Sequence, residues 1–600
     1  MTFGIDFGTS NSVVAHWNGH TTEVLPVDGD NVPSQWRQPE FEQLFPSVLS
    51  VRDLQRTLCF GWEAKTGTSE PLDAVKRMLG TRSAAEKDGN VDGLKVAAQL
   101  EEHHVWVGSE KFHSTVAAAA LFSRMKEGVS AQLLDLSDAV VTVPAKATGG
   151  ARYRTRAAAA LGGVKVRALL NEPTAAAISY AHDIPVPGRF LVFDWGGGTI
   201  DVTILEYEGG LFEEQTSRGI TSLGGLEFDN ALAQLIQREV GLTGDRLTKA
   251  ERRRWRRSVE LTKIALSSVP MDGAFFFDLP VGLAPSISKR GVRITAAEYT
   301  EAITPLITRA LEPVQQALKD LAITSDDIDS VLMIGGTSQI PQVRHALGEL
   351  LGHDRIVDSG LCRPMTAVAR GAAIYAASLD GELGDDSDFS LVTSYDLGTA
   401  VSAGEQKGFR AIIRRNATLP AEGSANFYPD TPGASSVRVP VIEGEAGYPA
   451  DSDRAFPLAS IEVSLPIREQ DIRRNKIEIK FRYNESGILR FTATHAQTGA
   501  VLAEREIDSF GPDGTPLQHG LDDELTRLLA HTVRPFANGS PSVQHPSAAE
   551  TANARPAPID MSVRVVETDP AVTVNGEPQG VVTRGFDQLP NPVTRFSDAP

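Results

Sequence analysis

Two short segments of the sequence share one design, and this repeat constrains the fold more than any other feature. The first, FGIDFGTSN, runs from Phe3 to Asn11, and the second, LVFDWGGGTID, runs from Leu191 to Asp201. In each, an apolar strand ends in an aspartate, and a tight turn of glycine and hydroxyl residues leads into another strand. Such a turn can direct backbone N–H groups at a phosphate, while the aspartate holds a cation. One copy is also typical of an ordinary hairpin loop. Two copies predict two similar lobes that face one nucleotide.

A third turn of the same kind, from Val331 to Ser338 (VLMIGGTS), also follows a strand and would approach the nucleoside end. Apolar strand-like runs at Val140 to Val143, Phe190 to Phe193 and Ser330 to Ile334 alternate with helical stretches over the first 380 residues. This alternation predicts an α/β unit.

The pattern changes after Gly381 to Ser390, which carries four acidic residues in ten and is predicted to be a solvated connector. In Lys476 to Tyr483, apolar and charged residues alternate with a period of two, which is typical of a half-buried strand. Similar short runs predict an antiparallel β-sandwich. They are Phe409 to Ile413, Val437 to Ile442, Ala459 to Val463, Ile488 to Thr494 and Val501 to Ile507.

The remaining C-terminal sequence contains little that can fold. Leu521 to Leu529 predicts one short helix, and residues 537–558 lack the apolar side chains that would offset the entropy of ordering. Asn575 and Gly576 are suited to a hairpin turn, although Pro578 weakens that interpretation. The last forty residues could occupy a binding groove or act as an interaction tail, but an inert tail is the preferred interpretation.

Charge and cysteine content narrow the classes of partner. The chain has 58 basic and 77 acidic residues, a net charge of −19, which argues against nucleic-acid and membrane partners. The arginine-rich run from Arg252 to Arg257 therefore predicts a solvated helix rather than a nucleic-acid patch. Cys59 and Cys362 form no metal-binding spacing and are expected to be reduced thiols. With no leader and no long apolar run, we expect a cytoplasmic protein.

Six further motifs, together with the three turns, make the chain resemble the seventy-kilodalton heat-shock (DnaK-type) chaperone family. The match is collinear from residue 3 to about 376 and continues into the second half. The motifs are Lys76 to Gly80 (KRMLG), Asn171 to Ala177 (NEPTAAA), Leu223 to Asp229 (LGGLEFD), Ile413 to Pro420 (IRRNATLP), Glu443 to Glu445 (EGE) and Asn484 to Leu489 (NESGIL).

The resemblance implies a sequence of five segments. An actin-like ATPase domain of two lobes would span residues 1–380, an interdomain linker 381–393, and a β-sandwich that binds peptide 394–510. A short remnant helix would follow in 511–536, and a disordered tail with a hairpin in 537–600. The implied function is ATP-dependent binding and release of extended apolar segments of unfolded or partly folded polypeptide. A J-domain cochaperone and a nucleotide-exchange factor are the other implied partners.

The resemblance also assigns roles to individual residues. Lys76 would stabilise charge on the γ-phosphoryl group, and Glu172 would orient the attacking water. Asp6, Asp194 and Asp201 would arrange Mg²⁺, and K⁺ where it binds, around the phosphates of ATP. Thr199 joins Lys76, Glu172 and Asp194 in the implied catalytic set. The implied nucleotide-binding residues are Gly8, Thr9, Ser10, Asn11, Gly196, Gly197, Gly198, Gly224, Gly225, Glu260, Lys263, Ser267, Gly335, Gly336 and Thr337.

Some of these assignments have alternatives. Glu260, Lys263 and Ser267 share one helix face, where matching residues of the family touch ribose and adenine, but a solvated Glu/Lys pair would show the same spacing. Ile264 and Gln339 stand where the family usually sandwiches adenine between arginines, so we expect faster nucleotide exchange.

Two other functions remain open. One is a nucleotide-sensing scaffold with little turnover, which intact Lys76, Glu172 and Asp194 disfavour. The other is a small-molecule kinase on the same core, which the appended sandwich disfavours. The family's long helical lid is absent, which should raise peptide off-rates.

Overall fold

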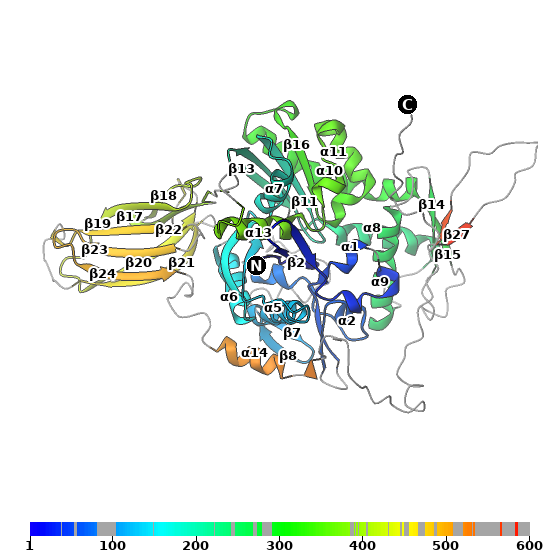
Figure 1. The fold of residues 1–600 in the computed structure, drawn as a ribbon, viewed down its shortest axis with the longest axis horizontal. Helices are drawn as coiled ribbons and strands as arrows, with labels where there is room; N and C mark the ends of the chain where they lie inside the picture. Colours follow the sequence, from blue (N-terminus) through cyan, green and yellow to red (C-terminus); the bar gives the residue numbers. More distant parts are fainter. Residues whose placement is uncertain are drawn as a thin grey trace, which may run out of the picture.

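The computed structural model shows a large two-lobed body, with a β-sandwich projecting from one side (Figure 1). It describes residues 1–600 except for a set of segments that are outside its description. These are residues 38, 53–56, 81–103, 148, 221, 242–246, 268–272, 279–290, 384–388, 390–391, 394, 404–405, 430, 445–446, 449, 451–454, 466–473, 485–488, 508–519, 531, 534–563, 567–582 and 586–600.

The first lobe is built on a sheet whose strand order is β10-β9-β1-β2-β3. Its strands are β1 (Thr2–Asp6), β2 (Asn11–Trp17), β3 (Thr22–Leu25), β9 (Asp138–Val143) and β10 (Lys165–Asn171), with β4 (Phe45–Pro46) paired to β2. β1 and β2 are antiparallel, while β9 runs parallel to β1. Because consecutive apolar residues of β1 are all buried, this sheet is covered on both faces, as the continuous apolar run predicts.

The second lobe repeats this arrangement in a sheet of order β13-β12-β11-β16. Its strands are β11 (Gly188–Trp195), β12 (Ile200–Glu208), β13 (Leu211–Ile220) and β16 (Ser330–Ile334). The β11–β12 pair is antiparallel and β16 is parallel to β11, so β11 corresponds to β1 and β16 to β9. The predicted strands at 140–143, 190–193 and 330–334 are confirmed.

Helices and smaller strands cover the two sheets. The helices are α1 (Pro39–Glu42), α2 (Gly61–Thr66), α5 (Ser114–Ser130), α6 (Gly149–Leu161), α7 (Glu172–Asp183), α8 (Gly225–Val240), α9 (Lys249–Leu266), α10 (Ala296–Asp320), α11 (Pro341–Leu351), α12 (Ser359–Cys362) and α13 (Ala367–Leu379). The 3-10 helices η3 (Val75–Leu79), η6 (Gly336–Gln339) and η7 (His353–Arg355) carry residues discussed below. The smaller strands are β5 (Leu49–Arg52), β6 (Thr57–Phe60), β7 (His104–Val107), β8 (Glu110–His113), β14 (Ala274–Asp278) and β15 (Gly291–Thr295).

Helices α7 and α13 cross at very short distance between the two sheets. A Cβ atom built on Gly371 of α13 would lie 1.7 Å from the carbonyl oxygen of Ala175 in α7, and one built on Gly4 of β1 would lie 2.2 Å from the backbone nitrogen of Ala373. These contacts exist only because glycine has no side chain. The small residues of the Asn171–Ala177 motif therefore serve the packing between the lobes.

The second half forms the predicted β-sandwich of two four-stranded antiparallel sheets, β18-β17-β20-β21 and β19-β22-β23-β24. In β22, Ile477, Ile479 and Phe481 are buried, as their alternation with charged residues predicts. The strands are β17 (Asp396–Ala403), β18 (Gln406–Ile413), β19 (Ala421–Phe427), β20 (Ser436–Gly444), β21 (Ala455–Ser464), β22 (Ile477–Tyr483), β23 (Leu489–His495) and β24 (Val501–Ile507).

The connector between the two halves is not solvated throughout, which corrects the prediction for Gly381 to Ser390. The Phe389 ring lies 5.7 Å from that of Phe212 in the second lobe, and its backbone N–H donates to Ser378. Beyond it, Val392 forms a bridge with Thr418 of the sandwich. Part of this connector lies outside the described residues.

The predicted C-terminal helix is present as α14 (Leu521–Leu529), but it lies on the first lobe and not on the sandwich (Figure 1). Leu521, Leu525 and Leu528 join the core around α5 and β8. Glu524 accepts a hydrogen bond of 2.9 Å from the backbone N–H of His113. α14 therefore tethers the chain to the first lobe.

Short strands follow α14. β25 (Thr532–Val533) pairs with β6, and β26 (Arg564–Val566) pairs with both β14 and β27 (Thr583–Gly585). β26 precedes and β27 follows the predicted Asn575–Gly576 turn, although the turn itself and the 537–558 segment lie outside the described residues. Among the helices that the structure describes, none combines the length and apolar character needed to span a bilayer.

Gly371→Ala should destabilise the protein. Alanine normally stabilises a helix interior relative to glycine by about 1 kcal/mol, but here the methyl group would collide with the backbone of Ala175. We expect a loss of about 1–3 kcal/mol, typical of overpacking. The thermal unfolding midpoint measured by calorimetry should therefore fall.

The matched control is Gly348→Ala in the middle of α11, where the three atoms nearest to the new methyl group all belong to the exposed side chain of His353. It should leave the midpoint unchanged or raise it. A midpoint for Gly371→Ala at or above that of the unmodified protein would contradict the close helix crossing.

Candidate functional site

The two repeated turns meet between the lobes. The first connects β1 to β2 and the second connects β11 to β12. A Cβ atom built on Gly197 of the second turn would lie 2.0 Å from the hydroxyl oxygen of Ser10 in the first. The two glycine-rich turns therefore face each other across one space, as their repetition in the sequence predicts.

The third turn and the start of α8 hold the second turn in place. Thr337 donates a 2.8 Å hydrogen bond to the carbonyl oxygen of Gly196, and the backbone N–H of Gly225 donates to the same oxygen at 3.1 Å. Gly335 has a φ of +80° and lies so close to β11 that a Cβ atom there would be 2.6 Å from the oxygen of Trp195. Glycine is required at this position for both its conformation and its contact.

A cavity of about 360 Å³ lies between these turns. It is large enough for a small organic ligand. Fourteen of the predicted site residues line it: Asp6, Gly8, Thr9, Ser10, Asn11, Lys76, Glu172, Asp194, Gly196, Gly197, Thr199, Asp201, Gly335 and Gly336. Residues from both sheets and from η3 thus converge on one site.

Acidic side chains surround Lys76 in the depth of this cavity. Lys76, in η3, forms a very short ion pair with Glu172 at the start of α7. Asp6 ends β1 and accepts a 3.3 Å hydrogen bond from the hydroxyl of Thr142. Asp194 and Asp201 are paired residues of the β11–β12 hairpin. The turn design places each aspartate where its strand ends at the cavity.

The pKa values of these groups reflect burial and crowding. Burial, reinforced by the charge of Glu172, raises the pKa of Asp6 to about 7 and that of Asp201 to about 6. The same two causes raise the pKa of Asp194 well above its ordinary value. Burial disfavours the charged form of Lys76, but Glu172, Asp6 and Asp194 together raise its pKa, so the lysine is a cation.

The carboxylates fit a bound Mg²⁺ ion. Three aspartates and one glutamate lie together beside Lys76 and Lys146, and burial, reinforced by the charge of Glu172, raises the pKa values of the aspartates. Mg²⁺ binds through one or two carboxylates together with substrate phosphates. Asp6, Asp194 and Asp201 are the residues that would hold it, directly or through water.

Seven predicted nucleotide-binding residues lie outside the cavity lining. Gly198, Gly224, Gly225 and Thr337 support the second turn from behind, since a Cβ on Gly224 would meet the backbone of Gly197 and Gly198. Glu260 and Lys263 are tied into ion pairs, with Lys65 and Asp229 respectively, each at 2.8 Å. The Ser267 hydroxyl donates to the carbonyl of Lys263 within α9.

Ile264 and Gln339, which stand where the family resemblance led us to expect arginines, make different contacts. Ile264 packs against an apolar cluster that contains Trp36 and Trp62 of the first lobe. Gln339 donates to the hydroxyl of Ser338 at 3.0 Å. Ile264 therefore replaces a stacking surface with a contact between the lobes.

The arginine-rich run was wrongly predicted to be merely solvated. It is helical, in α9, but Arg253 donates to the carboxylate of Glu70 at 2.7 Å, and Arg257 donates to the carbonyl of Thr66 at 2.6 Å. Together with the Lys65–Glu260 pair, these contacts join α9 of the second lobe to residues 65–70 of the first. They form a latch between the lobes, defined here as Lys65, Glu70, Arg253, Arg257 and Glu260.

Lys146 is a cavity residue that the sequence reasoning missed. It lines the cavity beside Asp201, whose charge favours its cationic form, while burial lowers its pKa. The only signal in the sequence is its place just after β9, because the carboxyl ends of parallel strands face the ligand in α/β sheets.

Comparisons with known proteins agree with this geometry. The family model described as Hsp70 protein matches residues 2–511. The chain is 33% identical over 553 residues to heat shock protein SSC3, mitochondrial, of Saccharomyces cerevisiae, covering 88% of this chain and 79% of that protein. It is 31% identical over 562 residues to the chaperone protein HscA homolog of Burkholderia cenocepacia, with 89% and 81% covered. The corresponding homolog of Bordetella petrii is 30% identical over 541 residues, with 89% and 81% covered.

Asp6→Asn should stabilise the nucleotide-free, metal-free protein in a pH-dependent way. Because the pKa of Asp6 rises from 3.8 to about 7 on folding, the folded state binds the proton more tightly. The free energy of unfolding of the unmodified protein therefore falls as the pH rises from about 4 to about 7. Asparagine stays neutral. The difference in thermal unfolding midpoint between the variant and the unmodified protein should therefore grow from pH about 4 to about 7 and then level off.

Asp201→Asn is the matched control, because its pKa rises only to about 6. Its advantage should level off about one pH unit earlier. An advantage that is constant with pH, or that grows as pH falls, would contradict the buried carboxylate cluster.

Arg257→Ala should speed nucleotide release. The substitution removes charge-assisted hydrogen bonds from Arg257 to the carbonyls of Thr66 and Gly67, which hold the lobes together. Bonds of this kind contribute about 1.5–3 kcal/mol when buried and less where partly exposed, so we expect a several-fold higher off-rate in stopped-flow displacement of a fluorescent nucleotide. Arg252→Ala, at an exposed position of the same helix, should leave the rate unchanged, and equal rates for the two variants would exclude the latch.

Proposed function

The chain belongs to the Hsp70 family, and on this premise we propose that it is an ATP-hydrolysing chaperone that binds and releases extended apolar segments of polypeptide. The observation that carries the proposal is the meeting of both glycine turns with Lys76 and Glu172 in one cavity, in a chain that also carries a β-sandwich. A site with this layout offers donors for phosphates and a carboxylate for water. The family members named above include chaperones.

The proposed ATP hydrolysis assigns a role to each group around the cavity. The backbone N–H groups and hydroxyls of the two turns, such as Thr9 and Thr199, donate to the phosphates. Lys76 neutralises charge on the γ-phosphoryl group, and Glu172, held by Lys76, orients the attacking water. Bound Mg²⁺ supplies further charge neutralisation on the phosphates. In this chemistry positioning and charge neutralisation provide most of the rate.

A row of polar side chains joins the sandwich to the catalytic glutamate. Glu443, at the end of β20, accepts a 2.9 Å hydrogen bond from the hydroxyl of Tyr483, and the charge of Arg152 in α6 acts on it. Arg152 also donates to the side chain of Asn171, the residue immediately before Glu172. We infer that a change in the position of Glu172 when ATP binds is transmitted to the sandwich through this row.

A second contact reinforces the junction. The side chain of Asn416 in the sandwich donates to Glu213 of β13 at 3.1 Å. Asn416 belongs to the motif from Ile413 to Pro420 that the resemblance singled out. Its backbone has a φ of +62°, which asparagine tolerates better than most residues.

The position of α14 on the first lobe affects the proposed cycle of peptide binding and release. Because α14 packs on the first lobe around α5 and β8, it does not cover the sandwich. We therefore retain the proposal of fast peptide release and of clients that are bulky or partly folded. A J-domain cochaperone and an exchange factor remain proposed partners.

We also propose a reducing, cytoplasmic location and K⁺ as an accessory ion. The location is supported by Cys59 and Cys362, which are both buried and form no disulfide with each other. Burial raises the pKa of Cys362 to about 12, so this thiol is unreactive.

The test is the off-rate of a fluorescent apolar peptide with ADP and with ATP, in the unmodified protein and in Lys76→Ala. ATP should speed release in both, because binding alone selects the low-affinity state, and hydrolysis in single turnover should be lost only in the variant. Removing a group that stabilises transition-state charge costs about a hundredfold to a thousandfold in rate.

Glu462→Gln is the control, because Glu462 lies in β21 and accepts a hydrogen bond from Ser436 of the sandwich itself. It should behave like the unmodified protein in both assays. Equal off-rates with ADP and ATP would reject the chaperone cycle. Retention of nucleotide binding without turnover in the unmodified protein would select the scaffold.

A further inference from the structure

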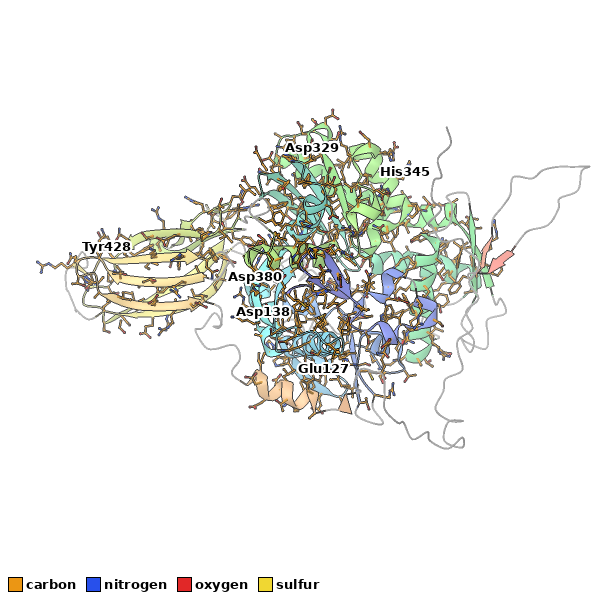
Figure 2. The ribbon with its side chains drawn as sticks, viewed as in Figure 1. Glu127, Asp138, Asp329, His345, Asp380 and Tyr428 are labelled. Carbon is orange, nitrogen blue, oxygen red and sulfur yellow. The ribbon has the colours of Figure 1, made fainter. Side chains whose placement is uncertain are left out.

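A cluster of metal-ligating side chains lies outside the nucleotide site, on the outer surface of the second lobe. His345 and Glu349 belong to α11, and His353 begins η7 immediately after it. Figure 2 labels His345 on this surface, away from the sandwich. One donor atom from each of the three residues lies within 4.8 Å of the others. In the described part of the chain, no other three His, Cys, Asp or Glu side chains bring their donor atoms this close together.

Two glycines bring His353 back over the helix that precedes it. Gly352 has a φ of +98°, a conformation open to glycine, and it reverses the chain after α11. A Cβ atom on Gly348 would lie only 2.2 Å from Nδ1 of the His353 ring. The imidazole therefore occupies space that exists because residue 348 has no side chain.

The resulting arrangement brings the two imidazoles and the carboxylate together. The rings of His345 and His353 have centroids 5.5 Å apart at an interplanar angle of 31°. Nε2 of His353 lies 2.9 Å from a carboxylate oxygen of Glu349. The His353–Glu349 contact needs only one imidazole, and the ring of His345 adds a third donor atom beside the same two side chains.

We propose that His345, Glu349 and His353 form a binding site for a divalent transition-metal ion of the Zn²⁺ class. Two imidazole nitrogens and one carboxylate oxygen are donors that suit zinc, whereas Mg²⁺ and Ca²⁺ prefer oxygen donors alone. The site is thus distinct in chemistry from the carboxylate cluster at Asp6 and Asp194. It goes beyond the proposed function and does not depend on it.

Small side-chain rotations would complete the coordination geometry. Zinc bonds to nitrogen and oxygen are about 2.0–2.2 Å long, so the donor atoms must come closer together than 4.8 Å. The side chains of His353 and Glu349 are 55% and 66% exposed, which leaves them free to turn. The remaining coordination positions face solvent and would hold water.

Metal binding would stiffen the end of α11. It would join η7 to the helix, and the residue after η7, Ile356, bridges to Val331 of β16, the strand that leads to the third turn. The bound ion should therefore stabilise the second lobe against unfolding.

The test is competition between untagged, chelator-treated protein and a chromophoric zinc indicator, with excess Mg²⁺ present to fill the carboxylate cluster. We expect one zinc ion per chain. His345→Gln, Glu349→Gln and His353→Gln should each weaken binding by at least about tenfold, because losing even outer-shell partners of a metal costs about 10–100-fold. His20→Gln, at an exposed histidine elsewhere, should bind zinc normally.

Gly348→Ala provides a second variant that keeps all three ligands. Its methyl group displaces the His353 ring, so zinc affinity should also fall, while the helix itself gains from alanine. Circular dichroism would confirm that α11 remains folded. The proposal is overturned if unmodified protein binds no more zinc than His345→Gln, or if Gly348→Ala and His345→Gln both bind as tightly as His20→Gln.

Discussion

The structure depends on holding four largely buried carboxylates beside two lysines, Lys76 and Lys146. Asp6, Asp194, Asp201 and Glu172 come from both lobes, and among these described carboxylates only Glu172 forms an ion pair, with Lys76. Burying like charges raises the free energy of the folded protein, as the raised aspartate pKa values indicate. The rest of the fold must offset this unfavourable arrangement. A cation and a phosphate chain can then gain affinity by relieving it.

The offset comes from packing between two lobes of the same design. Backbone-to-backbone contacts at Gly4, Gly371 and Gly224 allow sheets, helices and turns to approach more closely than any side chain would permit. On the opposite side of the cavity, the latch that includes Arg257 joins the lobes through contacts that can break singly. The lobes are therefore joined by close backbone contacts at the helix crossing and by side-chain contacts at the latch.

Sequence patterns predicted the elements well because their signals are local. The strand–turn repeats, the alternation in Lys476 to Tyr483 and the short helix at Leu521 to Leu529 are all present. What the sequence did not predict depends on contacts between distant residues. The packing of α14 on α5 and the contact of Phe389 with Phe212 leave no periodic pattern in the sequence. The hydrogen bonds of Arg253 and Arg257 to the other lobe leave none either.

The candidate site was predictable to the same degree. Residues within the repeated turns line the cavity, whereas Glu260, Lys263 and Ser267, placed by resemblance on a helix face, lie in ion pairs and capping contacts beside it. Helix periodicity fixes which side chains share a face but not what that face meets. The His345, Glu349 and His353 cluster had a spacing signal of four residues, yet its closure required the positive φ of Gly352, which spacing does not reveal.

The central claim is that the turns of two lobes close on one magnesium triphosphate. Calorimetric titration of nucleotide-free protein with ATP, in the presence and absence of Mg²⁺, tests it most directly. The account predicts one binding site per chain, with tighter binding when Mg²⁺ is present. No heat at millimolar ATP, or an affinity indifferent to Mg²⁺, would contradict it.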